Sequence, residues 1–179
     1  IDAGSGETVS RYEGDELTGV TNVVVVNGRV CAANTMRVIT KPVDAADATT
    51  VELEGTPTAA PSFSPDGRWA GYITRERDAA AGDELAYSLT AKAIDLDAGR
   101  HAAACPLPAG TSQAQMVAVD DEIMVLLTGV QRPDENKKKT RRNWFSSGRA
   151  ASDWSLMAVK LKTGTQLIAR KLAGHPGRA

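Results

Sequence analysis

Residues 131–152, reading QRPDENKKKTRRNWFSSGRAAS, combine basic and aromatic side chains in a pattern suited to binding. Seven Lys or Arg residues stand against two acidic ones, which gives this segment a net charge of +5 in a chain whose net charge is −1. The guanidinium groups of Arg141 and Arg142 can bind phosphate or carboxylate, and Trp144 and Phe145 can anchor a partner or stack on an unpaired base. The alternative is a solvated insertion whose two aromatic rings only fix the loop to the domain.

The other residues able to carry chemistry do not form a catalytic or metal-binding set. Neither His101 nor His175 has a partner at metal-ligand spacing, and both are expected at the surface. Asp95 and Asp97 lie near Gly99 without the pattern of a calcium loop, so we expect them to shape a turn. No G-x-S-x-G elbow accompanies the serines, and the glycines of residues 4–6 lack the lysine of a phosphate loop. We therefore predict no catalytic residue, no metal and no cofactor.

Composition indicates one ordinary globular domain. The 179 residues are 42% hydrophobic and 24% charged, and the near-zero net charge argues against a role of the whole surface on nucleic acid. No apolar run approaches the ~18 residues of a membrane-spanning helix. Cys31 and Cys105 permit one disulfide, but the repeats described next place them in strands too far apart, which favours two buried thiols.

Two kinds of turn alternate along the chain, and each joins two short apolar strands. Hairpin turns are expected at Asn27-Gly28, at Asp66-Gly67 and, in weaker form, at Asp120-Asp121. Turns of the second kind contain a glycine four residues after Asp95 and four residues after Lys160, and a further outer turn is expected within residues 44–49. A repeat of this length fits a four-stranded antiparallel blade with variable loops.

The most recognisable repeat is APSFSPDGRWAGYIT, residues 60–74. Residues 69–74 are apolar on both alternating sets of positions, as in a strand covered on both faces. Ser64-Pro65-Asp66-Gly67 resembles the S-P-D-G repeat of TolB-like β-propellers, which are related in architecture to WD40 repeats. The Thr163-Gly164 turn is also similar to those of quinoprotein-type propellers. Ala169 or Arg170 stands where that repeat has a tryptophan, so no quinone cofactor is predicted.

The sequence therefore predicts an all-β fold, a β-propeller or a propeller fragment in one domain over residues 1–174. Residues 17–56, 57–108 and 109–174 form its three blades, residues 1–16 form an outer hairpin of a preceding blade, and residues 175–179 are a tail. Residues 23–26, 62–64 and 115–119 are expected to be equivalent innermost strands. Because propellers close with about four or more blades, missing blades or another copy of the chain would complete the ring. A complete small ring closed by the N-terminal hairpin is the alternative.

The resemblance implies a module that binds proteins. TolB-like propellers serve as protein-binding platforms in the bacterial envelope, which favours an extracytoplasmic location, or as gates over the active site of a peptidase. We therefore predict a non-catalytic scaffold that recognises a protein or peptide, with Arg141, Arg142, Trp144 and Phe145 as candidate binding residues. The alternative is the propeller part of a larger enzyme, peptidase-type or quinoprotein-like, whose catalytic residues lie outside this chain.

Overall fold

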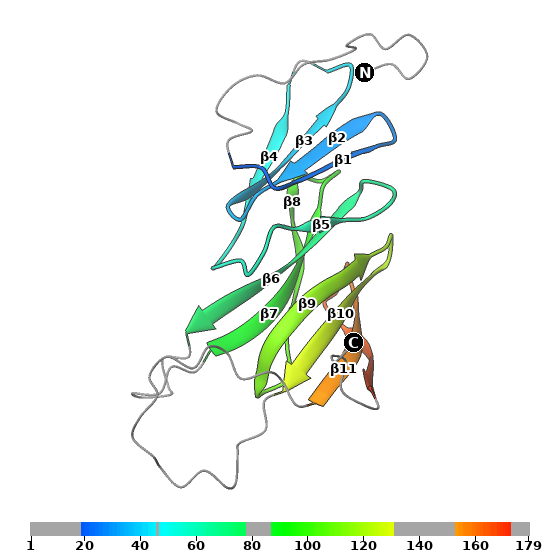
Figure 1. Cartoon of the computed structure of the whole chain (residues 1–179). Coiled ribbons are helices and arrows are strands. Elements are labelled where there is room, and N and C mark those ends of the chain that lie inside the picture. The colour runs from blue at the N-terminus through cyan, green and yellow to red at the C-terminus, as the bar shows by residue number, and fades with distance from the viewer. Residues whose placement is uncertain (1–18, 46, 78–86, 131–152, 173–179) are drawn as a thin grey trace, which may run out of the picture.

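The computed structural model describes residues 19–45, 47–77, 87–130 and 153–172, and these residues form β-strands and no helix. The strands make three four-stranded antiparallel sheets that follow one another along the chain and lie side by side in space (Figure 1). The described residues do not close into a ring. The N-terminal hairpin and the C-terminal tail predicted above lie outside the described residues.

Each sheet is a simple meander in which strands adjacent in sequence are paired. The first sheet contains β1 (Asn22–Val26), β2 (Arg29–Ala33), β3 (Arg37–Pro42) and β4 (Thr49–Glu52). The second contains β5 (Ser62–Phe63), β6 (Trp69–Arg77), β7 (Tyr87–Asp95) and β8 (Arg100–Pro106). The third contains β9 (Thr111–Val119), β10 (Ile123–Val130), β11 (Asp153–Lys160) and β12 (Gln166–Lys171). The predicted innermost strands fall on β1, β5 and β9, the first strand of each sheet.

The strands meet at the turns that the sequence predicts. Asn27 and Gly28 connect β1 to β2 with φ of 49° and 69°, a left-handed pair that Asn-Gly favours, and Gly67 has φ of 71° between β5 and β6. Asp120 and Asp121 lie between β9 and β10. These three turns lie on the same side of the molecule (Figure 1).

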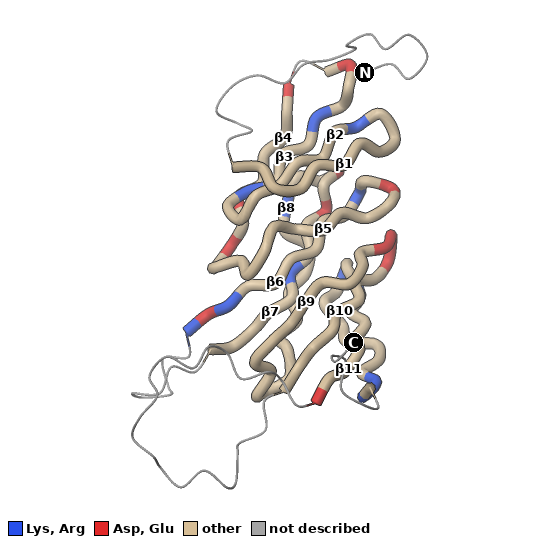
Figure 2. The backbone as a smooth tube through the Cα atoms, in the orientation of Figure 1, with Lys and Arg blue, Asp and Glu red and all other residues tan. Residues whose placement is uncertain are grey.

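Two hydrophobic clusters hold the three sheets together. Residues 69–74 of β6 are buried on both sides, as predicted, because β6 lies in the middle sheet. Between the first and second sheets lie Cys31, Ala33, Val38, Val51, Ala70, Tyr72, Ile94 and Leu96. Between the second and third lie Trp69, Ile73, Leu89, Ala91, Ala93, Cys105, Leu107, Val119, Met124, Leu126, Met157, Val159 and Leu161. Charged residues gather mainly at the turns and strand ends, which leaves the sheet interiors apolar (Figure 2).

One backbone contact recurs after the third strand of every sheet. The amide of the residue that follows this strand donates to a carbonyl in the turn between the first and second strands. The three bonds are Val43 to Gly28 at 2.7 Å, Leu96 to Arg68 at 2.8 Å and Leu161 to Glu122 at 2.9 Å. The donor residue is apolar each time, and two of the donors, Leu96 and Leu161, pack in the clusters between sheets.

A second contact recurs after the fourth strand, and its donor is a leucine in all three sheets. The bonds are Leu53 to Met36 at 2.7 Å, Leu107 to Leu89 at 2.8 Å and Leu172 to Trp154 at 2.8 Å. Leu53 packs into the first cluster and Leu107 into the second. The three sheets are therefore built on one repeated plan, although their sequences share few identical residues.

Candidate functional site

The four candidate binding residues Arg141, Arg142, Trp144 and Phe145 lie outside the described residues. The structure does show where their segment joins the sheet. Val130 at the end of β10 and Asp153 at the start of β11 are direct partners in the antiparallel register. They lie at the opposite end of the third sheet from the turn of Asp120 and Asp121.

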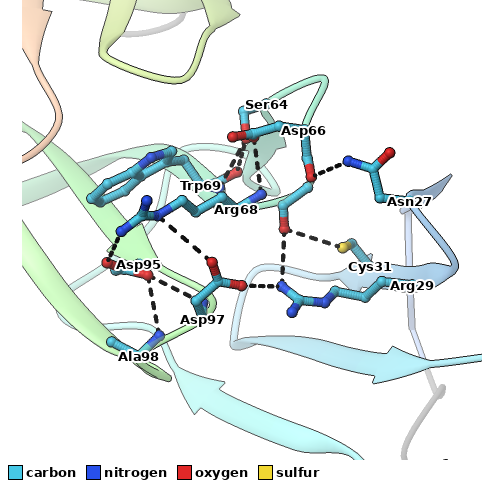
Figure 3. A network of polar contacts seen from close by, with 11 residues as sticks. Asn27, Arg29, Cys31, Ser64, Asp66, Arg68, Trp69, Asp95, Asp97 and Ala98 are labelled. Carbon is cyan, nitrogen blue, oxygen red and sulfur yellow. Dashed lines mark hydrogen bonds and ion pairs between the residues drawn. The ribbon is translucent and has the colours of Figure 1, made fainter.

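A polar network on the turn side joins the first and second sheets (Figure 3). Arg29 at the start of β2 donates to the Asp97 carboxylate at 2.7 Å and to the Gly67 carbonyl at 3.3 Å. The side-chain amide of Asn27 donates to the Asp66 carbonyl at 3.0 Å. The buried Cys31 thiol lies 3.9 Å from the Gly67 carbonyl oxygen. Side chains of the first sheet therefore hydrogen-bond to the backbone carbonyls of the S-P-D-G turn.

The S-P-D-G residues also stabilise their own turn. The Ser64 hydroxyl donates to the Asp66 carboxylate, which also accepts the backbone N–H of Arg68 at 3.0 Å. The Trp69 N–H donates to the Ser64 oxygen at 2.9 Å. Partial burial acts to raise the pKa of Asp66, but the hydrogen bonds from Ser64 and Arg68 outweigh it and hold the pKa below its usual value. Asp66 is thus an ionised turn-forming residue.

Asp95 and Asp97 shape the β7–β8 turn, which confirms the turn role predicted for them. The Asp95 carboxylate accepts the N–H groups of Asp97 and Ala98, each at 3.1 Å. The Arg68 guanidinium lies 3.4 Å from Asp95 and 3.7 Å from Asp97, and it also lies 5.4 Å from the centre of the Trp69 ring. These two carboxylates therefore carry ion pairs between and within sheets.

The outer edge of the same interface holds a second polar group. The Tyr72 hydroxyl accepts the N–H of Glu54 at 3.2 Å and lies 3.3 Å from Nδ1 of His101. Nε2 of His101 lies 2.9 Å from the Glu52 carbonyl oxygen, and Lys92 pairs with Glu54 at 2.9 Å. His101 was predicted at the surface, but only 26% of its side chain is exposed because the neighbouring sheet covers the ring.

Burial raises the pKa of Tyr72 to about 12, from the ordinary value of 10.0 for a tyrosine side chain. A phenol that ionises less readily in the fold than in the unfolded chain contributes stability that is complete below pH 10 and is lost as the pH rises to about 12. We therefore expect the stability advantage of the native chain over Tyr72→Phe to shrink across this window. Urea unfolding of both proteins from pH 8 upward measures it, and a constant difference would contradict the assignment.

Thiol and metal chemistry find no support among the described residues. Cys31 and Cys105 are buried and unbridged, as favoured from the sequence, and burial raises the pKa of both thiols away from the reactive thiolate. No group of three His, Cys, Asp or Glu side chains within residues 19–45, 47–77, 87–130 and 153–172 could hold a metal ion. No helix in the same ranges is long and apolar enough to cross a membrane.

A cavity of about 280 Å³ opens between the second and third sheets. Gly71 and Tyr72 of β6 form one wall, and Ala114 and Met116 of β9 form part of the other. The remaining lining residues are Thr58, Ala59, Ala60, Ser62, Ile73 and Gln115. The lining carries no charged side chain, so the cavity favours no ionic ligand.

No protein-family model, no curated protein and no solved structure matches this chain. The function must therefore be inferred from the sheets, their contacts and the sequence itself.

Proposed function

We propose that the chain is a propeller-type scaffold that binds a protein or peptide and carries out no reaction itself. The observation that carries this proposal is the repeated plan of the three sheets, in which the same two backbone contacts close each meander. A stack of equivalent sheets is the architecture that repeat proteins use to present binding surfaces.

The contacts of Asp95, Asp97 and His101 support the same proposal. Asp95 and Asp97 bind backbone amides and arginines, and His101 bonds across the sheet interface. Each of these side chains has a structural partner within the described residues, so each contributes to holding the scaffold together.

The proposed contact region is the segment 131–152, which leaves the third sheet on the side away from the three turns. Its net charge of +5 suits an acidic surface on a partner, and its two aromatic residues suit apolar pockets on that surface. The segment interrupts β10 and β11 where Val130 and Asp153 are paired. A two-residue Asn-Gly turn can therefore replace it without changing the register of these strands.

The test compares proteins captured by the full chain with those captured by the variant in which Asn-Gly replaces residues 131–152. A second variant keeps the segment but replaces Arg141, Arg142, Trp144 and Phe145 with alanine. We expect both variants to melt near the melting temperature of the native protein. The amount of partner that each variant captures is expected to fall at least tenfold. Equal recovery by all three proteins would refute the role of this segment.

A further inference from the structure

Each sheet in the stack has a face toward the following sheet, which we call its forward face. Directly paired residues share a face of a sheet. Cys31 and Thr40 form a row on the forward face of the first sheet, and Gly71 and Ala93 form the matching row on the second. Cys31, Thr40 and Ala93 are all buried there, because the following sheet covers them.

The forward face of the third sheet has the same row without a described sheet over it. Val125, Ala158 and Ile168 are paired across β10, β11 and β12 at the matching positions. Leu127 and Leu156 form the neighbouring row. Ile168 is 63% exposed, and the other four residues are half-buried, whereas Ile73, Ala91 and Ala93 at matching positions of the second sheet are at most 4% exposed.

At the opposite end of the stack, the backward face of the first sheet is exposed along β1, whereas Ala32 and Ile39 on the same face are buried at 2% and 5% exposure. Val23 and Val25 of β1 are 58% and 67% exposed there. Val43 occupies the position at which Leu96 and Leu161 are buried against the preceding sheet, at 3% and 0% exposure. Val43 itself is only half-buried. Along β1 and at Val43, the first sheet thus leaves apolar groups open at positions that a preceding sheet would cover.

In the second and third sheets, a glycine in the turn between the third and fourth strands contacts the preceding sheet. Gly99 faces the Thr49 side chain, whose methyl group would lie 3.1 Å from an added Cβ, and Gly164 lies directly against the backbone of Ala104. Both contacts fall on the outermost strand of the preceding sheet, close to the row described above. The equivalent place on the third sheet is near Ile168, the most exposed residue of its forward face.

We infer that a second copy of this chain binds head to tail, with the backward face of its first sheet on the forward face of the third sheet, and that two copies close one ring of six sheets. This rests on the proposed propeller-type architecture. Val43 at one end and the row of Val125, Ala158 and Ile168 at the other repeat positions that already meet at both internal interfaces, so one copy supplies both halves of the contact. Six sheets also lie within the range of blades found in closed propellers.

The mass in solution tests this inference, measured by light scattering and sedimentation at micromolar concentrations. We expect twice the 18.9 kDa mass of one chain. Val25→Asp alters only the backward face and Ile168→Asp only the forward face, and each is expected to weaken self-association at least tenfold. Met36→Asp is the matched control, because Met36 is 68% exposed in the turn before β3 and outside both faces.

Mixing the two single variants distinguishes head-to-tail binding from a contact between two like faces. A pair formed by one copy of each variant has one fully native interface, so the mixture is expected to associate more strongly than either variant alone. Circular dichroism checks folding, and Val25→Thr and Ile168→Thr replace any acidic variant that melts early. A single-chain mass for the native protein, open assemblies that grow with concentration, or a dimer insensitive to both faces would each overturn the inference.

The partner-capture experiment is independent of this result. A native protein that stays monomeric but captures a partner through residues 131–152 would overturn the ring and leave the proposed function standing. A dimer that captures no partner through that segment would overturn the proposed binding role of residues 131–152 and leave the ring standing.

Discussion

Replacing Gly67 with alanine is expected to destabilise the chain by about 2–4 kcal/mol. Gly67 has φ of 71°, a left-handed conformation that costs other residues free energy because their Cβ meets the backbone. A Cβ here would also collide with Cγ1 of Val26 on the preceding sheet. The substitution therefore strains the S-P-D-G turn and pushes apart two packed sheets.

Gly28 provides the matched control for the backbone part of this effect. Its φ of 69° is nearly the same, but a Cβ added there has no atom within 4 Å. Gly28→Ala is therefore expected to cost only the backbone penalty, about 1–2 kcal/mol. Urea unfolding measures both variants.

A double-mutant cycle isolates the contact itself. In the Val26→Ala background, Gly67→Ala should cost little more than Gly28→Ala, because the colliding methyl group is gone. Equal costs for Gly67→Ala with and without Val26 would show that the collision is not the cause. Partner capture by folded Gly67→Ala should be unchanged, since this turn and the pair Val130 and Asp153, which flank residues 131–152, lie at opposite ends of the sheets (Figure 1).

The turns could be predicted from the sequence because their signals are local. Asn27, Gly28 and Gly67 adopt left-handed backbone between flanking apolar strands, and no distant contact is needed to form these turns. The burial of both faces of β6 was predicted for a similar reason, since alternate positions of residues 69–74 are all apolar or small.

The contacts between sheets could not be predicted in the same way. Arg29 and Asp97 are 68 residues apart in sequence, and their pairing depends on how one sheet lies on the next. The leucines Leu53, Leu107 and Leu172 repeat with unequal spacing because segments of different length separate the strands. A search for apolar residues directly after each fourth strand would have found them. The binding role of Arg141, Arg142, Trp144 and Phe145 stays a prediction.

Replacing Trp69 with alanine is expected to have the largest effect of any single core substitution, about 3–5 kcal/mol of unfolding free energy. The ring is 2% exposed in the cluster between the second and third sheets, so its removal leaves a large cavity at that interface.

Trp69→Phe separates packing from hydrogen bonding at this position. Nε1 of Trp69 is buried and has no hydrogen-bond partner among the described residues. Phenylalanine keeps most of the apolar volume and removes this unsatisfied donor, whose burial itself costs about 1–3 kcal/mol. Its net cost is therefore expected to stay below about 1.5 kcal/mol, the range of well-tolerated apolar replacements. Urea unfolding compares the two variants, and a phenylalanine variant as unstable as the alanine variant would mean that the indole nitrogen carries a stabilising contact.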